Sequence, residues 1–405
     1  MKCGLLGRKL GHSYSPQIHA MLGGYSYELF EKEPEMLEDL LKNGDFQGIN
    51  VTVPYKKAVI PYLDELTPIA EKLQAVNTIV RRDGKLIGHN TDYFGFQMLL
   101  DSLPFPVSSK KVLVLGSGGA SNTAVAVLRD RGAEVTVISR SGEQNYGTLH
   151  LHSDAALIVN TTPVGMYPNT GISPVDLSVF TGLQGVVDVI YNPARTQLLL
   201  DAGKIGGLAC VNGLLMLVAQ AKEAAEWFTG SSISDDVIRP ILRSLEKQMQ
   251  NIILIGMPGC GKSTIGKIIA GKTGKKFADP DELIVDLAGK TIQQIFAEDG
   301  EESFRVLETK VLSELGKQSG LVIATGGGCV TKARNYDLLH QNGKIFWIQR
   351  DIAALPTEGR PLSQKHAPEE MYRIREPMYR SFMDRCIENN GLPQEAADRI
   401  LEVCL

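Results

Sequence analysis

The sequence has no long hydrophobic run, no leader-like segment and little net charge. No apolar stretch approaches the length of a membrane span. The first residues, 1–7, are too short and too rich in glycine for a signal peptide and are typical of a first strand. A net charge of −4 gives no indication of nucleic acid or an anionic membrane as a partner. We therefore expect a cytoplasmic protein with neither kind of partner.

Cysteine pairs and metal-binding histidine spacings are also missing. The six cysteines lie far apart and none forms a C-x-x-C pair, which is typical of reduced thiols rather than of a disulfide framework. The seven histidines show no spacing suited to a metal. Stabilisation by disulfides or zinc is therefore not expected.

What is present indicates a multidomain α/β protein. A chain of 405 residues is too long for one ordinary core, and 43% hydrophobic residues with 41 glycines are typical of a globular α/β protein. No linker rich in proline, glycine or serine is visible. Alternating short strands and helices predict lobes at 1–101 and 102–212, helices at about 213–249 that complete the first lobe, and a third domain at 251–405.

Residues 256–264, Gly-Met-Pro-Gly-Cys-Gly-Lys-Ser-Thr, form the most specific motif. They follow an apolar strand at 252–255 and precede a segment with helical apolar spacing. Lys262 can reach the outer phosphates of a nucleotide and Ser263 can hold Mg²⁺, while the helix N-terminus favours the anion. The alternative is a glycine-rich turn without a ligand. The expected ATP-binding residues here are Gly259, Cys260, Gly261, Lys262, Ser263 and Thr264.

A second glycine-rich turn, residues 116–121, lies between a strand at 112–115 and a helix at 122–131. It resembles a dinucleotide-binding turn whose third glycine is replaced. Ser139-Arg140-Ser141 ends the next strand, where an enzyme for NAD usually has an acidic residue, and this favours the 2′-phosphate of NADP(H). A surface arginine without a ligand is the alternative. The expected cofactor site comprises Gly116, Ser117, Gly118, Gly119, Ala120, Ser139, Arg140, Ser141, Val189 and Gly213.

Polar clusters at strand ends mark residues 1–101. Strands are expected at 3–6, 27–30, 48–53, 78–81 and 85–88. Lys56 and Asp92 are the obvious acid–base partners among these clusters, because a buried Lys–Asp pair can pass a proton. A surface salt bridge is the alternative for the pair taken alone.

Residues 1 to about 248 resemble shikimate dehydrogenases over their full length. The family motifs are matched by Ser13-Tyr-Ser15, Asn50 to Lys56, Ala75 to Thr78, Asn90 to Asp92, Tyr191 to Pro193 and Gly213 to Gln220. The resemblance implies that Lys56 and Asp92 are catalytic and that the substrate is surrounded by Ser13, Ser15, Thr52, Asn77, Asp92, Tyr191 and Gln220. Asn122 and the lack of a second arginine after Arg140 depart from the family pattern. Quinate dehydrogenases share the fold, so quinate stays open as a substrate.

Acceptor-side groups follow the phosphate loop in the last third of the chain. Asp281 can orient or deprotonate a hydroxyl, while Lys262, Mg²⁺ and Arg360 can neutralise a moving phosphoryl group. Arg305 and Glu308 have the spacing of one helix face, and Gly327 belongs to a bare triple glycine. Arg305 and Arg375 can fix a carboxylate. For each arginine, a surface or helix-pairing role is the alternative.

Residues from about 251 to the end resemble shikimate kinases, with D-x-D, F-R-x-x-E, triple glycine and R-P-L in family order. The resemblance implies that Asp281, Arg305, Gly327 and Arg375 bind shikimate, that Ser263 and Asp279 serve Mg²⁺, and that Arg360 closes on ATP from a mobile lid. Ala353 and Gly391 stand where the family often has arginines facing adenine. Weaker nucleotide binding is therefore expected.

The two resemblances share one small molecule. We expect an α/β chain made of a two-lobed dehydrogenase (a substrate lobe and a Rossmann NADP lobe) followed by a P-loop kinase with a central parallel sheet. The implied reactions are NADPH-dependent reduction of 3-dehydroshikimate and ATP-dependent phosphorylation of shikimate, with small molecules as partners and a homodimer as a candidate assembly. The alternative is a dehydrogenase joined to a kinase-like module that only senses nucleotide or shikimate.

Overall fold

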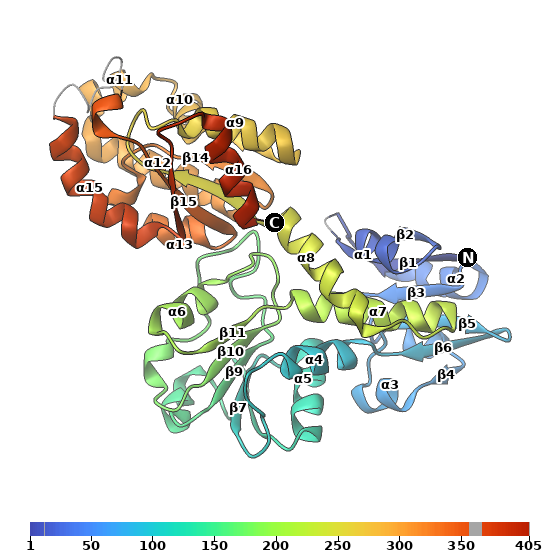
Figure 1. The fold of residues 1–405 in the computed structure, drawn as a ribbon. Helices are drawn as coiled ribbons and strands as arrows, with labels where there is room; N and C mark the ends of the chain where they lie inside the picture. The colour runs from blue at the N-terminus through green and yellow to red at the C-terminus, as the bar shows by residue number, and fades with distance from the viewer. Residues whose placement is uncertain (12, 356–366, 405) are drawn as a thin grey trace. The chain divides into compact units, whose positions relative to one another are not determined.

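The computed structural model describes residues 1–11, 13–355 and 367–404. Two compact units are present. The first comprises Met1–Val164, Pro174–Tyr191 and Asp201–Ser244, and the second comprises Gly165–Ser173, Asn192–Leu200 and Leu245–Leu405. No helix among the described residues is both long enough and apolar enough to cross a membrane. Figure 1 shows the three sheets in sequence colours.

A mixed six-stranded sheet forms the first lobe. Its strand order is β2-β1-β3-β5-β6-β4, with β1 parallel to both neighbours and β5 antiparallel to β3 and β6. Buried aliphatic side chains such as Leu6, Ile49 and Ile79 fill its core. The elements are β1 (Lys2–Gly7), α1 (Ser15–Leu22), β2 (Ser26–Glu31), α2 (Leu37–Asn43), β3 (Gly48–Val51), β4 (Glu65–Leu66), α3 (Pro68–Leu73), β5 (Thr78–Arg82), β6 (Lys85–His89) and α4 (Asp92–Asp101).

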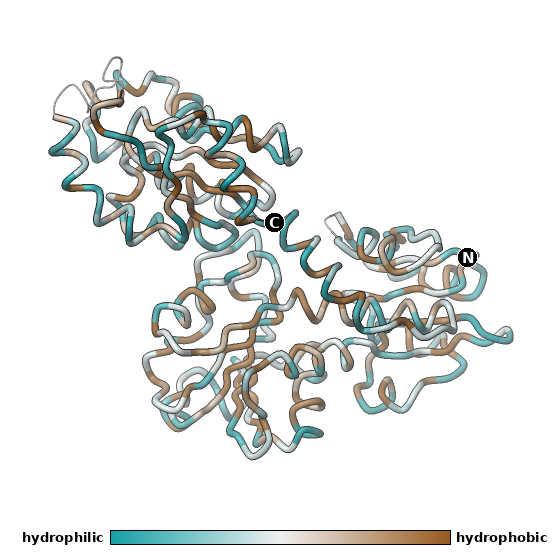
Figure 2. The backbone as a smooth tube through the Cα atoms, viewed as in Figure 1, coloured by the Kyte–Doolittle hydropathy of each residue, from teal (hydrophilic) through white to brown (hydrophobic). Residues whose placement is uncertain are grey.

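A second, wholly parallel sheet follows, in the order β11-β10-β9-β7-β8. Its central strands β9 and β10 are buried at every position, as parallel strands covered on both faces should be. Figure 2 shows the corresponding brown, hydrophobic stretches along the chain. The elements are β7 (Lys111–Leu115), α5 (Gly119–Asp130), β8 (Glu134–Ile138), β9 (Leu157–Asn160), β10 (Gly185–Asp188), α6 (Gln197–Ile205) and β11 (Ala209–Val211).

Helix α7 (Leu214–Thr229) returns from the second sheet to the first lobe, and α8 (Ile238–Met249) follows it. α7 contacts α4, α1, β3 and β5. Phe228 of α7 packs closely on Gly48 of β3, because a Cβ added to Gly48 would lie 2.1 Å from the Phe228 ring. α7 therefore packs on elements of the first lobe.

The second unit contains a five-stranded parallel sheet in the order β13-β14-β12-β15-β16. Its first strand, β12, is central and every residue of it is buried. The chain connections diverge on the two sides of β12, so the loop that follows it lies where ligands bind in such sheets. The elements are β12 (Asn251–Ile255), α9 (Lys262–Thr273), β13 (Lys276–Ala278), α10 (Pro280–Ala288), α11 (Ile292–Gln294), α12 (Gly300–Lys317), β14 (Leu321–Ala324), α13 (Arg334–His340), β15 (Gly343–Gln349), α15 (Pro368–Phe382), β16 (Arg385–Glu388) and α16 (Pro393–Cys404).

Most expected elements are present, but several boundaries differ. β3 ends at Val51 rather than 53, before the cis peptide bond of Val53–Pro54, and α5 begins at Gly119 rather than 122. Within the helices expected at about 213–249, a 3₁₀ turn at Asp235–Val237 precedes α8, which begins at Ile238. β15 and β16 were not predicted. The expected lid with Arg360 lies outside the described residues.

Candidate active sites

The first candidate site is organised around the pair Lys56 and Asp92. Lys56 follows β3, and Asp92 opens α4, where the helix N-terminus favours its negative charge. The Nζ atom of Lys56 lies 2.5 Å from Oδ2 of Asp92. The side chain of Asp92 is only 10% exposed and that of Lys56 is 28% exposed, so the pair is screened less than a surface salt bridge. This geometry favours the acid–base interpretation over the surface alternative.

Asn77 holds the other oxygen of Asp92. Its Oδ1 accepts the backbone N–H of Thr91 at 2.7 Å, which turns its Nδ2 toward Oδ1 of Asp92 at 3.0 Å and Oε1 of Gln220 at 3.1 Å. Asn77 is almost wholly buried. Three residues predicted at the substrate site are therefore joined in one hydrogen-bond network.

A cavity of about 340 Å³ opens beside this network. Its walls include seven of the predicted residues, namely Ser13, Ser15, Thr52, Lys56, Asn77, Tyr191 and Gln220. Asp92 does not line the cavity and reaches it through Lys56 and Asn77. The lining combines an ammonium group with hydroxyls and amides, which suits a small hydroxylated anion.

Sequence reasoning missed His19 in the same wall. The imidazole stacks on Tyr27 with 4.0 Å between ring centroids, and its Nδ1 lies 2.6 Å from the hydroxyl of Tyr25. Burial lowers the pKa of His19 to about 3, so the ring is neutral near pH 7. His19 lies one helical turn after Ser15, and this i,i+4 spacing is the signal that could have identified it.

The predicted cofactor residues lie at the carboxyl ends of the second sheet's parallel strands. Gly116 follows β7 with φ +106°, a conformation that favours glycine. Ser117, Gly118, Gly119 and Ala120 lead into α5, and Ser139-Arg140-Ser141 follow β8 with Arg140 exposed.

Val189 and Gly213 meet beyond β10. A Cβ at Gly213 would lie 1.9 Å from the Val189 carbonyl oxygen. By contrast, a Cβ at Gly118 or Gly119 would meet no atom within 4 Å. Open space before a helix N-terminus fits the approach of a pyrophosphate to the backbone.

The second candidate site is a cavity of about 740 Å³ around the phosphate loop. Gly256, Gly259 and Gly261 have φ values of +141°, +85° and +101°, so the loop's path requires glycine at each. Nζ of the buried Lys262 donates to the carbonyls of Gly256 and Met257, both at 2.9 Å, which places the cation inside the arc of the loop. A phosphate chain is the ligand class that this arrangement fits.

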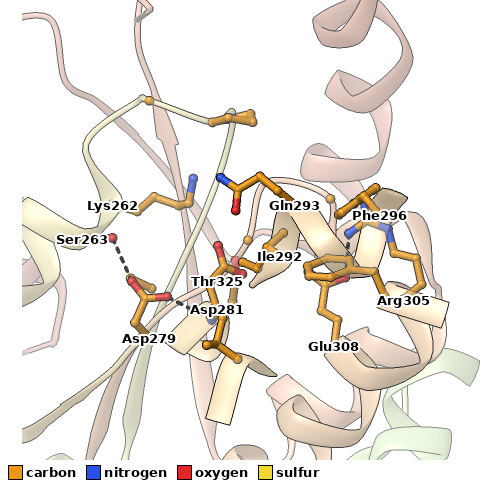
Figure 3. Close-up of a pocket in the computed structure, with 18 of the residues that line it drawn as sticks. Lys262, Ser263, Asp279, Asp281, Ile292, Gln293, Phe296, Arg305, Glu308 and Thr325 are labelled. Atoms are coloured by element: carbon orange, nitrogen blue, oxygen red, sulfur yellow. Dashed lines mark hydrogen bonds and ion pairs between the residues drawn. The ribbon is translucent and has the colours of Figure 1, made fainter. Parts of the chain in front are cut away.

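Ser263 and Asp279 form the oxygen pair expected for Mg²⁺. The Ser263 hydroxyl donates to Oδ2 of Asp279 at 3.2 Å, and Oδ1 of Asp279 accepts the backbone N–H of Asp281 (Figure 3). Two protein oxygens suit Mg²⁺, which keeps several waters and takes other ligands from phosphates. The described residues contain no group of three or more His, Cys, Asp or Glu side chains arranged as a metal cage. The donor set therefore fits a nucleotide-bound Mg²⁺.

Arg305 is held by two carboxylates on its own helix. Its Nη1 lies 2.7 Å from Oε2 of the buried Glu308 (Figure 3). Its Nη2 lies 3.0 Å from Oε1 of Glu301. Burial lowers the pKa of Arg305, but the ion pairs with Glu308 and Glu301 outweigh it and raise the pKa overall. Arg305 and Glu308 thus lie on one face of α12, as their spacing predicted, and both line the cavity.

Asp281 faces the same cavity with an unsatisfied oxygen. Its Oδ1 is buried and has no hydrogen-bond partner among the described residues. Burial, then repulsion from Asp279, raises the pKa of Asp281, while Lys262 and Arg305 oppose the rise. A carboxylate with a raised pKa beside two cations is suited to accept a proton or to hold a hydroxyl.

The remaining acceptor residues come from the triple glycine and from α15. Nη1 of the buried Arg375 donates to the carbonyl of Gly327 at 3.3 Å, and both residues line the cavity. Sequence reasoning missed Phe296 and Phe304 as an apolar wall, with ring centroids 4.8 Å apart. Their eight-residue spacing places them in two different helical segments, so no single helical period revealed the pair.

Comparison with known proteins assigns families to both parts of the chain. Residues 5–79 match the model of the shikimate dehydrogenase substrate binding domain, and residues 258–405 match that of shikimate kinase. The shikimate dehydrogenase (NADP(+)) of Clostridium perfringens (strain 13 / Type A) is 36% identical over 265 residues, covering 60% of this chain and 97% of that protein.

Solved structures agree with the dehydrogenase assignment. A chorismate mutase/shikimate 5-dehydrogenase fusion protein from Clostridium acetobutylicum is 36% identical with a TM-score of 0.58, covering 61% of this chain and 97% of that one. A shikimate 5-dehydrogenase from Thermus thermophilus, solved with NADP(H) and shikimate, is 31% identical with a TM-score of 0.54. The match covers 60% of this chain and 99% of that one. The chain therefore belongs to the shikimate dehydrogenase family and carries, at residues 258–405, a shikimate kinase domain.

Proposed function

We propose that this chain is a bifunctional enzyme that reduces 3-dehydroshikimate with NADPH and phosphorylates the product, shikimate, with ATP. The dehydrogenase half is supported by the Lys56–Asp92–Asn77 network, which lies beside a polar cavity. The kinase half is supported by one observation above all. A single cavity is lined by a phosphate loop, the Ser263–Asp279 oxygen pair, Asp281, and the two buried arginines 305 and 375.

In the reduction, NADPH supplies a hydride to the carbonyl carbon of the substrate. The ammonium of Lys56 donates a proton to the carbonyl oxygen, so that a C–H and an O–H bond form as the C=O double bond becomes single. Asp92 stabilises the charged lysine before the transfer, and Asn77 holds Asp92 in place. Ser13 and Ser15 are positioned at the cavity wall to bind the substrate carboxylate.

In the phosphorylation, Mg²⁺ bound with ATP neutralises charge on the phosphate oxygens. Asp281 accepts the proton of the attacking hydroxyl as the hydroxyl oxygen bonds to the γ-phosphorus and the bond to the bridging oxygen breaks, so that ADP leaves. Lys262 stabilises the charge that develops on the phosphoryl group. Arg305 and Arg375 bind the acceptor carboxylate, which places the hydroxyl toward the phosphate loop. Electrostatic positioning supplies most of the catalysis in this class of reaction.

The experiment that tests both halves uses one incubation and two matched variants. The full chain is given 3-dehydroshikimate, NADPH, ATP and Mg²⁺, and the products are identified by mass spectrometry. We expect shikimate 3-phosphate from the wild type, unphosphorylated shikimate from Lys262→Ala, and no shikimate from Lys56→Ala. The Lys56→Ala protein should still phosphorylate added shikimate.

A nucleotide- or shikimate-sensing module is the second candidate for residues 251–405. It is favoured by Ala353 and Gly391 at positions where arginines often face adenine in shikimate kinases. If the wild type binds ATP and shikimate but consumes no ATP, this candidate replaces the kinase. Quinate given with NADP⁺ in place of shikimate tests the substrate preference of the dehydrogenase half.

A further inference from the structure

Tyr379 lies in the floor of the kinase site without lining its cavity. The side chain comes from α15 and is wholly buried. Its hydroxyl donates to the carbonyl oxygen of Gly327 at 2.5 Å and lies 3.9 Å from Sδ of Met257 in the phosphate loop. Trp347 of β15 stacks on the phenol ring at 5.7 Å between centroids, which fixes the plane of the ring. The hydroxyl is therefore held at the junction of the triple glycine and the phosphate loop.

Gly327 is contacted from two sides at this junction. On one side, a Cβ at this position would come within 2.7 Å of Pro258 in the phosphate loop. On the other side, the Gly327 carbonyl accepts from both Tyr379 and Nη1 of Arg375, which precedes Tyr379 by one helical turn. The contact to Tyr379 is shorter by 0.8 Å, since the two distances are 2.5 and 3.3 Å.

The Gly327 carbonyl is partly buried and paired with protein donors, and the identity of its main donor matters here. Because Tyr379 supplies the shorter hydrogen bond, Arg375 makes only the longer contact and its guanidinium can still face an acceptor carboxylate. Without the hydroxyl, Arg375 would be the donor left to the Gly327 carbonyl and would be drawn away from the cavity. The same loss would loosen the peptide of Gly327, whose segment lines the acceptor side.

We propose that Tyr379 is a positioning residue of the kinase site, which holds the Gly327 peptide against the phosphate loop and leaves Arg375 available for the acceptor. This inference rests on the proposed kinase function. It assigns Tyr379 to acceptor binding rather than to nucleotide binding or to packing alone.

The test compares Tyr379→Phe with Tyr372→Phe in the full chain. Tyr372 lies two turns earlier on α15, and its hydroxyl accepts a hydrogen bond from Gln349, so its loss also removes one hydrogen bond from the same helix. Both variants keep the aromatic ring. The readouts are kcat, the KM for shikimate, the KM for ATP and the midpoint of thermal unfolding.

For Tyr379→Phe we expect the KM for shikimate to rise about fivefold to tenfold, as loss of one partly buried hydrogen bond implies. The KM for ATP should stay within about twofold of the wild type, and Tyr372→Phe should leave both constants unchanged. A shikimate KM that is the same in the two variants, whatever their melting temperatures, overturns the inference. A wild type that does not phosphorylate shikimate overturns the proposed kinase function, and the inference with it.

Discussion

The ammonium of Lys56 and the carboxylate of Asp92 lie 2.5 Å apart, although 35 residues separate them in the chain. Asn77 holds the second oxygen of the same carboxylate at 3.0 Å. One residue follows a strand of the first sheet and the other opens a helix, so the pair exists only because the sheet brings β3 and β6 to the same region. The carboxylate that pairs with the proposed proton donor is thus held from two directions.

Replacing Lys56 by alanine should lower the dehydrogenase turnover by at least ~10²-fold, because the reaction loses its positioned acid. The measurement is NADPH oxidation in the presence of 3-dehydroshikimate. Lys57→Ala is the matched control, since Lys57 is the exposed neighbour of Lys56. Near-normal turnover of Lys56→Ala would show that the Lys56–Asp92 ion pair has a structural role and no catalytic one.

Removing Arg140 should reduce the preference for NADPH over NADH. We expect the KM for NADPH to rise about tenfold in Arg140→Ala, the effect of losing a hydrogen bond to a charged group, while the KM for NADH is unchanged. Arg129→Ala, which removes an exposed charge from α5, serves as the control. An unchanged ratio of the KM for NADPH to the KM for NADH would refute the assignment of Arg140 to the 2′-phosphate.

Asp281 should link kinase activity and stability to pH in opposite directions. Burial raises the pKa of this carboxyl, so phosphorylation should begin to fail on acidification at a higher pH than it would with an ordinary aspartate as the base. The folded chain keeps the Asp281 proton to higher pH than the unfolded chain. Its contribution to the free energy of unfolding therefore falls as the pH rises through that window, and at neutral pH the ionised carboxylate destabilises the fold.

Asp281→Asn should consequently abolish phosphorylation and raise the melting temperature at neutral pH by about 2–4 °C. The gain should disappear below about pH 4, where the aspartate is protonated in both states. Asp286→Asn on the exposed face of the same helix is the control for loss of a negative charge. A lower melting temperature in Asp281→Asn at neutral pH would contradict the assigned burial cost.

Gly328→Ala should disturb the acceptor arginine directly. The backbone of Gly328 has φ −103°, which alanine adopts, but the new Cβ would lie 2.1 Å from Nη2 of Arg305. We expect the guanidinium to shift and the KM for shikimate to rise about tenfold or more, as for loss of a charged hydrogen bond.

The KM for ATP should change little in Gly328→Ala. Gly271→Ala on α9, where the Cβ meets no atom within 4 Å, should leave the kinetics intact and stabilise the helix by about 0.5–1 kcal/mol. Steady-state kinetics and thermal unfolding measure both variants, and an unchanged shikimate KM in Gly328→Ala would contradict the placement of Arg305 at the acceptor.

The sequence by itself determined the local features of this protein. The phosphate loop at 256–264 and the turn at 116–121 could be predicted because strand, glycine turn and helix are contiguous. The Arg305–Glu308 pair could be predicted because residues i and i+3 are neighbours on a helix. The central buried strands were visible as apolar runs. These signals depend on backbone geometry over a few consecutive residues, so they can be recognised without knowing the tertiary structure.

Only the tertiary structure decided the relationships between distant residues. It placed His19 in the wall beside Lys56, set Phe296 against Phe304, and brought Tyr379 to the carbonyl of Gly327, 52 residues away in sequence. None of these pairs has a fixed sequence spacing. The contacts of His19 and Tyr379 depend on which strands become neighbours in the sheet, and that order is set by the packing of the whole core rather than by any one segment.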